Sequence, residues 1–334
     1  MKQRCFGSLP TGERVTEYTI TNGKFSARVL DYGAILRSLT VFGRDVVGGF
    51  DRIEDYLADD SHQGGTVGRI ANRIGGACFT LDGVEYKVTA NSGKNCLHGG
   101  ERGFDRRMWK LVGYDGEDTV SFCYSSADGE EGFPGRLDVS VQYKLTDNGL
   151  LISYGGYAHD RTVASLTNHA YFNLDGFGGD ILSHRVAIFA DEYTAVDGEL
   201  IPTGEHKSVK GTPLDFTVAK PIGEAIEAIG GVDHNFILSG KDFIMPEASA
   251  LRLAATVENG DIRLTMYTDR PCVQVYTGNF LGGGPDFKGG TKQVKHGALC
   301  LEAQTEPNGV KHGQDILGKG EAYMQTTLYA FEKI

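Results

Sequence analysis

The sequence predicts an all-β protein, a large antiparallel β-sandwich with a few short helices. Three observations favour this class: apolar and polar residues alternate over many short runs, 47 glycines stand against 9 prolines in 334 residues, and helical patterns are few. Alternation with a period of two is typical of half-buried strands, and glycine is typical of the turns between them. Long helical segments do not alternate with these strands, which argues against a parallel α/β sheet. Because no linker, charge run or internal repeat interrupts the pattern, we expect one domain over residues 1–334.

Alternating runs predict the strands in chain order. They lie at 79–88, 120–124, 137–145, 150–154 and 251–268. Turns are expected at Asp82-Gly83, at Asp147-Asn148-Gly149 and at Asn259-Gly260. The Asp-Gly and Asn-Gly pairs favour two-residue hairpin turns because these residues accept positive φ.

Helical signals are short and occur twice. Residues 53–57 carry apolar side chains at helical spacing for one or two turns. A second short helix is expected to open at Pro221 and to close at Gly230-Gly231. Its apolar face would hold Ile222, Ile226 and Ile229.

The net charge and the cysteine pattern indicate which binding partners and which cellular compartment to expect. The net charge of −11 argues against nucleic acid and anionic membranes as partners. No run of 18 apolar residues and no signal-peptide pattern occurs, and six cysteines form no CxxC pair. We therefore expect reduced thiols and a cytoplasmic location. A monomer and a homodimer both fit the sequence.

Several motifs of metal and cofactor sites are incomplete. Residues 313–319 match the start of a phosphate-binding P-loop, but Gly320 stands where a magnesium-binding hydroxyl is needed and no long helical pattern follows. Gly64-Gly65-Thr66-Val67-Gly68 lacks the βαβ context of a dinucleotide site. The nine histidines include no HxH, HxxxH or HExxH pair, and no GxSxG elbow is present. We expect no metal and no cofactor.

Four groups of segments carry more polar residues than a sandwich needs. They are 68–75; 91–109; 167–174; and a C-terminal group made of 232–236, 273–279 and 299–304. Asn, Gln, Asp, Glu, Arg and His alternate there with Tyr and Phe. Amides and carboxylates bind sugar hydroxyls in pairs of hydrogen bonds, and aromatic faces pack on the C–H surface of a sugar ring. The combination indicates a carbohydrate cleft.

The strand at 299–304 separates two faces. Leu299, Leu301 and Ala303 alternate with Cys300, Glu302 and Gln304. In a sheet with one face on the core, Glu302 faces either solvent or a cleft. Each of these residues also has an ordinary structural explanation when it is taken alone. Glu302 could lie on a solvated face, and His98 or His169 could be structural histidines. Arg73 could be an ion-pair partner.

The segments together resemble the aldose 1-epimerase, or galactose mutarotase, family. The matching segments are GRIANRI at 68–74, NCLHGG at 95–100 with GFD at 103–105 and Trp109, TNHAYFNL at 167–174, VDHNF at 232–236, VQVYTGN at 273–279 and CLEAQ at 300–304. They occur in the order typical of the family. The resemblance implies a galactose mutarotase-like β-supersandwich that interconverts the anomers of free hexoses such as galactose and glucose.

The resemblance also implies roles for individual residues. Glu302 would be the base on the anomeric hydroxyl and His169 the acid at the ring oxygen, assisted by His98. The implied substrate-binding residues are Asn72, Arg73, Asp233, Gln274 and Tyr171. Residues 305–309 read TEPNG, where the family usually has a His-containing, proline-rich loop leading to Pro-Asn. We expect this departure to affect the rim of the cleft rather than the chemistry.

Three alternatives share some of these features, and one of them, a β-sandwich lyase or hydrolase, would be expected to carry further modules and a secretion signal. A hexose-phosphate epimerase of the same fold would need extra cations, and Arg69, Arg102, Arg106 and Arg107 are available. A non-catalytic sugar-binding sandwich would need neither Glu302 nor His169. For the enzyme, we expect a bell-shaped pH profile, because Glu302 must be ionised and His169 protonated. Carboxylates should raise the pKa of His169 and cations should lower that of Glu302, which would widen the bell.

Overall fold

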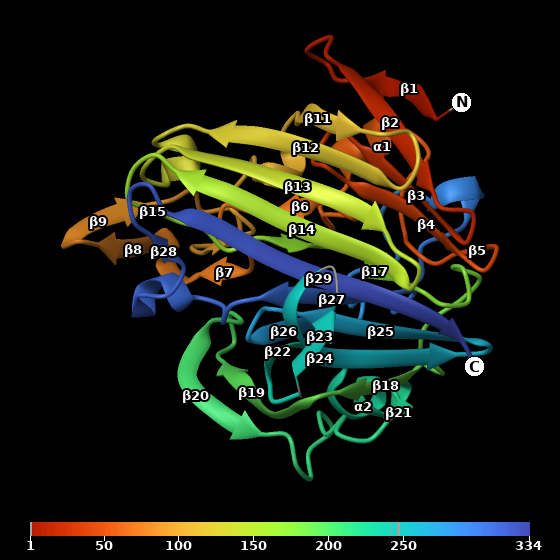
Figure 1. Cartoon of the computed structure of the whole chain (residues 1–334). Coiled ribbons are helices and arrows are strands. Elements are labelled where there is room, and N and C mark those ends of the chain that lie inside the picture. Colours follow the sequence, from red (N-terminus) through yellow and green to blue (C-terminus); the bar gives the residue numbers. More distant parts are fainter. Residues whose placement is uncertain (1, 241, 246–247) are drawn as a thin grey trace.

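The architecture is all-β, as the sequence predicts (Figure 1). The computed structural model describes residues 2–240, 242–245 and 248–334. Its largest sheet has ten strands in the order β11-β12-β13-β14-β29-β25-β24-β18-β21, with β23 paired to β24, and all its pairs are antiparallel. These strands are β11 Lys110–Tyr114, β12 Thr119–Ser126, β13 Leu137–Leu145, β14 Gly149–Ala158, β18 Arg185–Ile188, β21 Lys220–Pro221, β23 Asp242–Met245, β24 Ala248–Asn259, β25 Ile262–Thr268 and β29 Ala322–Lys333.

Two further sheets and several short pairs complete the fold. The six-stranded sheet holds, in spatial order, β17 Tyr171–Phe172, β27 Leu299–Gln304, β26 Cys272–Tyr276, β22 Asp233–Leu238, β19 Ala190–Val196 and β20 Pro202–Ser208. The five-stranded sheet holds β1 Gln3–Ser8, β2 Arg14–Thr21, β3 Phe25–Leu30, β4 Leu36–Val41 and β5 Arg44–Asp45. The pairs are β6 Thr66–Val67 with β16 Thr167–Asn168, β7 Arg73–Ile74 with β10 Cys96–Leu97, β8 Cys78–Leu81 with β9 Val84–Lys87, and β15 Thr162–Val163 with β28 Ile316–Leu317. The helices are α1 Ile53–Ala58, α2 Gly223–Ile229 and the 3₁₀ turns η1 Gly75–Ala77, η2 Phe104–Arg106, η3 Glu130–Gly132, η4 Lys288–Gly290 and η5 Gly309–His312.

Two of the three predicted turns are confirmed, and the third consists of Gly260 and Asp261, one residue later than the predicted Asn259-Gly260. Asp82 and Gly83 have φ of 52° and 78° and join β8 to β9. Asn259 pairs with Ile262 across the turn that contains Gly260, and Leu145 pairs with Leu150 across the turn at 147–149. The residues after the incomplete P-loop motif enter β29, so no helix follows that motif in the described chain.

The second predicted helix exists but begins later than expected. Pro221 ends strand β21, where it pairs with Arg185, and α2 begins at Gly223. A proline without an N–H group is tolerated at such a strand end, so the chain uses it to finish the sheet rather than to open the helix. The predicted end is confirmed, since Gly230 is left-handed and its N–H donates to the carbonyl of Ile226.

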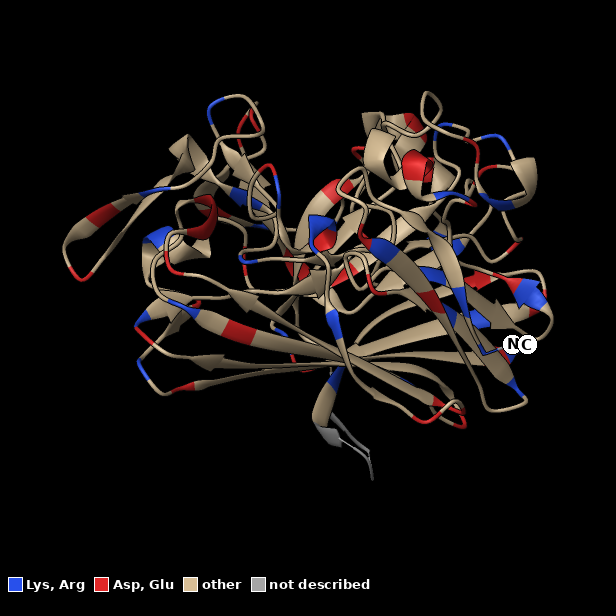
Figure 2. Ribbon diagram, turned by 90° about the horizontal axis from the view of Figure 1, so that it is seen from above, with Lys and Arg blue, Asp and Glu red and all other residues tan. Residues whose placement is uncertain are grey.

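The main core lies between the ten-stranded sheet and the other elements. Figure 2 shows a lower layer of long strands, with further strands, short helices and loops above it. Alternate residues of β13 and β14 and the predicted inner face of β27 are buried in one apolar cluster. Full burial of each such aliphatic side chain contributes about 1.5–3 kcal/mol, so β27 is firmly anchored on its core face.

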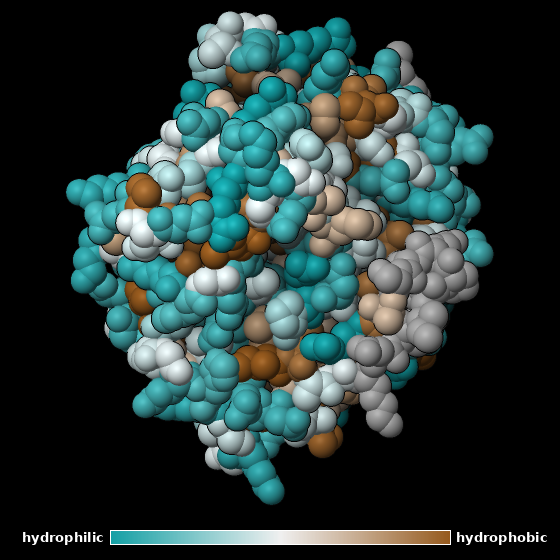
Figure 3. Space-filling view, turned by 60° about the vertical axis from the view of Figure 1, so that its left-hand side comes forward, coloured by the Kyte–Doolittle hydropathy of each residue, from teal (hydrophilic) through white to brown (hydrophobic). Residues whose placement is uncertain are grey.

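The surface is polar and mixed in charge. Basic and acidic residues are interspersed around the molecule (Figure 2), and the face in Figure 3 carries hydrophobic residues only in small groups. Among the described residues, no helix combines the length and the apolar character needed to cross a membrane.

Candidate active site

A cavity of about 530 Å³ brings together side chains that lie far apart in the sequence. Its walls come from the loops after α1, β6 and β10, from the β16–β17 connection and from β22, β26 and β27. All eight predicted site residues line it: Asn72, Arg73, His98, His169, Tyr171, Asp233, Gln274 and Glu302. The structure therefore assembles the complete predicted set in one place.

Glu302 lies in the cavity wall and not on a solvated face. Leu301 on the same strand is in the main core, whereas Cys300 packs in a second apolar cluster that covers the opposite face of the sheet. Glu302 is only 2% exposed, and its Oε2 has no hydrogen-bond partner among the described residues. The carboxylate is therefore held by its strand in the cavity wall, and one of its oxygens is buried without a hydrogen-bond partner among the described residues.

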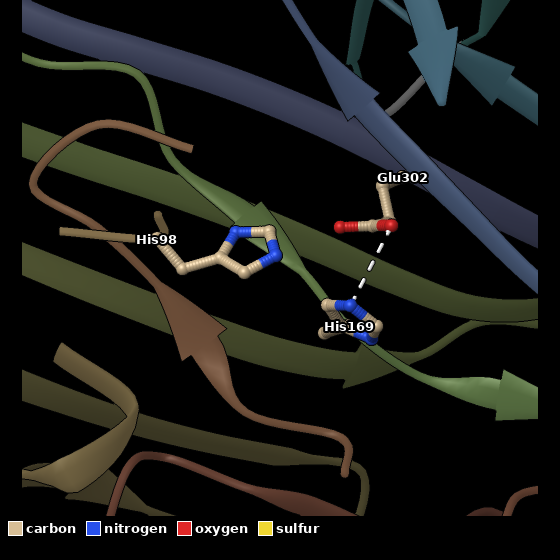
Figure 4. A group of neighbouring side chains, drawn as sticks. All are labelled: His98, His169 and Glu302. Atoms are coloured by element: carbon tan, nitrogen blue, oxygen red, sulfur yellow. Dashed lines mark ion pairs between the residues drawn. The ribbon is translucent and has the colours of Figure 1, made fainter. Parts of the chain in front are cut away.

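His169 faces Glu302 across a short gap. It lies between β16 and β17, and its Nε2 is 3.7 Å from Glu302 Oε1 (Figure 4). This separation exceeds a normal hydrogen bond, so the two groups do not satisfy each other. His169 is also stacked on Tyr171, with ring centroids 5.1 Å apart, and the hydroxyl of Tyr171 donates to the carbonyl of Ser61. The aromatic ring thus fixes the plane of the imidazole.

His98 is the third member of the group in Figure 4. It follows β10 with a positive φ of 52°, and its Nδ1 accepts the backbone N–H of Asn72 at 3.2 Å. With Nδ1 accepting, the ring proton of neutral His98 is on Nε2. Asn72 also has a positive φ, and its Oδ1 accepts the N–H of Arg73, so this backbone orients three of the predicted side chains.

The expected pKa directions for the acid and the base are wrong. Burial, reinforced by Asp233, raises the pKa of Glu302 well above its usual value despite the opposing charge of Arg73. Burial, reinforced by His62, lowers the pKa of His169 to about 3. The same causes place the pKa of His98 well below its usual range. Desolvation exceeds the effect of neighbouring charges, because the groups are removed from water almost completely.

Asp233 and Gln274 form a coupled pair on neighbouring strands. Gln274 Nε2 donates to Asp233 Oδ1 at 2.6 Å, and Gln274 Oε1 has no partner among the described residues. Burial raises the pKa of Asp233, and Arg73 opposes this shift. The pair presents a carboxylate and an amide oxygen to the cavity, the groups expected for sugar hydroxyls.

Sequence reasoning missed several polar residues that line the cavity, namely Asp59, Asp60, Ser61, His62, Ser92, Tyr276 and Gln293. His62 lines the cavity and is bound to Asp105 of η2 at 2.8 Å. Tyr276 and Phe280 also line the cavity, and Phe280 is 83% exposed at its rim. Tyr276 belongs to a segment that the resemblance covers, whereas no local signal identifies His62. The departing segment 305–309 is absent from the described lining, and Glu306 instead binds Thr194 and His206.

The donor atoms of His98, His169 and Glu302 could in principle hold a metal ion. They lie within 4.8 Å of one another. A tetrahedral zinc ion with ligand bonds of about 2.0–2.2 Å needs donors roughly 3.4 Å apart, so the side chains would have to move inward. The present spacing leaves room for a ligand oxygen between them.

Comparisons with known proteins identify the family of the chain. The family model described as aldose 1-epimerase matches residues 16–330. The galactose mutarotase of Bos taurus is 41% identical over 98% of this chain and 97% of its own, and the aldose 1-epimerase of Escherichia coli K12 is 36% identical over 96% of each. The crystal structure of an aldose epimerase homologue from C. elegans superposes with a TM-score of 0.87 at 29% identity, covering 95% of this chain and 99% of its own. The chain belongs to the aldose 1-epimerase family.

Proposed function

We propose that this aldose 1-epimerase interconverts the α and β anomers of free hexoses, galactose and glucose, with Glu302 and His169 as its base and acid. One observation carries the assignment: a carboxylate and an imidazole lie 3.7 Å apart, both buried, in the wall of a cavity with polar residues around it. Two groups at this separation can reach two oxygens that are bonded to the same carbon atom. In a cyclic aldose these are the anomeric oxygen and the ring oxygen.

The proton balance of the reaction requires only these two groups. Glu302 takes the proton of the anomeric hydroxyl while protonated His169 gives a proton to the ring oxygen, and the bond from C1 to the ring oxygen breaks. The aldehyde rotates, and closure on its other face returns both protons. Each positioned acid or base contributes roughly 10²–10⁴-fold to the rate. His98, with its proton on Nε2, is placed to donate to an oxygen beside His169.

The charge of the cavity favours a neutral sugar over a sugar phosphate. Among the described residues that line it, Arg73 is the one Arg or Lys, against Asp59, Asp60, Asp233 and Glu302. Three of the four arginines considered for a phosphate are held by other groups of the protein, and none of the four is among the described lining residues. Arg69 binds the carbonyls of Pro134 and Gly135, Arg106 binds Asp60, and Arg107 binds the carbonyl of Arg102. A phosphate would therefore meet an excess of negative charge.

Polarimetry tests the activity directly. Fresh α-D-galactose and α-D-glucose should relax to their equilibrium rotation at a rate proportional to protein concentration, after subtraction of the spontaneous rate. Glucose 6-phosphate should relax no faster than in buffer. A relaxation rate independent of protein concentration for both free sugars would leave a sugar-binding protein as the better description.

Replacing Arg73 should impair both binding and turnover. Arg73→Ala removes the cation that opposes the raised pKa of Asp233 and of Glu302. We expect a higher KM and a lower kcat, each by roughly tenfold or more, because a misplaced ring loses orientation as well as affinity. Steady-state polarimetry measures both constants. Arg136→Ala, at an exposed arginine paired with Asp138, is the control and should change neither. An unchanged KM for both sugars would contradict the proposed contact.

A cytoplasmic location and a monomeric or homodimeric state are part of the proposal. The free thiols Cys96, Cys272 and Cys300 are buried, which suits a reducing compartment. Light scattering coupled to size-exclusion chromatography measures the oligomeric state and distinguishes a monomer from a dimer.

A further inference from the structure

His62 lies in the cavity wall although no sequence pattern points to it. It follows α1 in a loop whose backbone is left-handed at His62, with φ of 57°. Two residues later, the Cα of Gly64 lies against the backbone carbonyl of Leu36. A Cβ added at Gly64 would lie 2.1 Å from that carbonyl oxygen. This close contact fixes the loop, so His62 is placed by the fold and not by a flexible tip.

Asp105 orients the His62 ring. His62 Nδ1 lies 2.8 Å from Asp105 Oδ2, and Asp105 is only 6% exposed. Burial would raise the pKa of Asp105, but His62, the charge of Arg106 and a backbone hydrogen bond together hold this pKa below its usual value. An ionised carboxylate can only accept a hydrogen bond, so Nδ1 of His62 carries the proton. Nε2 is then the nitrogen that is left for another partner.

The ring stands beside both histidines of the proposed chemistry. Its centroid is 4.8 Å from that of His98 and 5.9 Å from that of His169. The charged and titratable groups around it are Asp105, Asp59, Arg106, His98 and His169. A histidine oriented by a buried carboxylate is the arrangement that fixes one tautomer and one direction of the imidazole.

We propose that His62 is a further substrate-binding residue, whose Nε2 forms a hydrogen bond with a sugar hydroxyl, and that Asp105 is the residue that positions it. The inference rests on the proposed function, because it assigns a contact to the same sugar. It adds a third histidine and a second buried carboxylate to the working site. In this assignment His62 and Asp105 hold a sugar hydroxyl, while Glu302 and His169 transfer the protons.

Two substitutions at His62 separate a substrate contact from a purely structural role. In His62→Asn the amide replaces Nδ1, so the bond to Asp105 survives, but nothing replaces Nε2, and Asn tolerates the left-handed backbone. In His62→Gln the amide reaches the position of Nε2 but leaves Asp105 without its partner. A substrate contact predicts that KM rises by roughly tenfold in His62→Asn and by less in His62→Gln, the loss of one hydrogen bond being of that size. A structural role predicts the reverse order, with the larger fall in melting temperature for His62→Gln.

Asp105→Asn tests the positioning role. Its KM should rise as in His62→Asn, and the double variant should be little worse than either single one, because the two residues act as a unit. Nitrogen-15 NMR of the imidazoles should show the proton of neutral His62 on Nδ1 in the wild type and a mixture of tautomers in Asp105→Asn. The matched control is the other His–Asp pair, His159 with Asp138, which is partly exposed and absent from the cavity lining. His159→Asn should leave KM and kcat unchanged.

Equilibrium binding of D-galactose separates this inference from the proposed function. The affinity is measured by isothermal titration at anomeric equilibrium, so it needs no turnover. If the wild type binds galactose without accelerating mutarotation, the proposed function fails, and the order of affinities among wild type, His62→Gln and His62→Asn still decides the contact. Equal affinities of wild type and His62→Asn, or no binding to folded wild type, would overturn the assignment of His62.

Discussion

Glu302→Gln should reduce kcat by roughly 10²–10⁴-fold while sugar still binds within a few-fold of the wild-type affinity. Gln keeps the length of the side chain and one acceptor oxygen but cannot take a proton from the anomeric hydroxyl. The fold should tolerate the change, because Leu301 and Ala303 anchor β27 in the core and the substitution removes a buried carboxylate close to Asp233. Polarimetry gives the rate, and isothermal titration gives the affinity.

Glu306→Gln is the matched control for this experiment. Glu306 lies four residues further along the chain, and its carboxylate binds His206 at 2.9 Å instead of lining the cavity. Its kcat should stay within a factor of about two of the wild-type value, as expected for a partly exposed surface pair. A folded Glu302→Gln variant that loses only a few-fold in kcat would exclude Glu302 as the base.

Local patterns were sufficient for the strands and turns but not for every boundary. The Asp82-Gly83 turn was predicted because its conformation depends on the residues in the turn itself, whereas the turn after β24 consists of Gly260 and Asp261, one residue later than predicted. The start of α2 was wrong, because Pro221 is used by a strand pairing with Arg185, which is 36 positions earlier in the sequence. A local rule for proline at helix starts contains no information about such a partner.

The candidate site, too, has features that local patterns predict and features that depend on distant parts of the chain. Alternation along β27 placed Glu302 on the face opposite Leu301, but it could not say whether that face meets solvent or a cleft. The answer depends on the second apolar cluster, which contains Cys300 together with residues of β2, of β3 and the loop after it, and of α1. His62 shows the limit most clearly, since its partner Asp105 lies 43 residues away. Only tertiary structure brings the two together.

The pKa directions could not be obtained from composition. Counting charges near Glu302 and His169 predicts that each stabilises the ionised form of the other. In the structure both side chains are buried, and the loss of water moves each pKa toward the neutral form, reinforced by His62 at His169 and by Asp233 at Glu302. A sequence supplies the identity of the charges, whereas desolvation depends on how completely the fold covers them.

The pH dependence of kcat/KM should follow from these two opposed shifts. The reaction uses one proton held by the pair, on His169, with Glu302 ionised. On raising the pH, the pair loses its first proton near the lowered pKa of His169, about 3, and its second at the raised pKa of Glu302. Between these limits the pair holds one proton and the active arrangement is a constant fraction of it, so kcat/KM should be level there. It should fall at alkaline pH, where the last proton leaves, and both limbs belong to the coupled pair.

In His169→Gln the rate should rise at alkaline pH, where the rate of the wild type falls. The variant lacks the acid and should lose roughly 10²–10⁴-fold in rate. Its residual activity depends on ionised Glu302 alone, and burial still raises the pKa of that carboxyl, so the rate should increase with pH through the range in which the wild-type rate declines. Polarimetry in buffers of constant ionic strength, with the spontaneous rate subtracted at each pH, gives both profiles. His312→Gln, at an exposed histidine that the described cavity lining does not include, should keep the wild-type profile. If His169→Gln declines at alkaline pH as the wild type does, the shared proton is not on His169, and another group must serve as the acid.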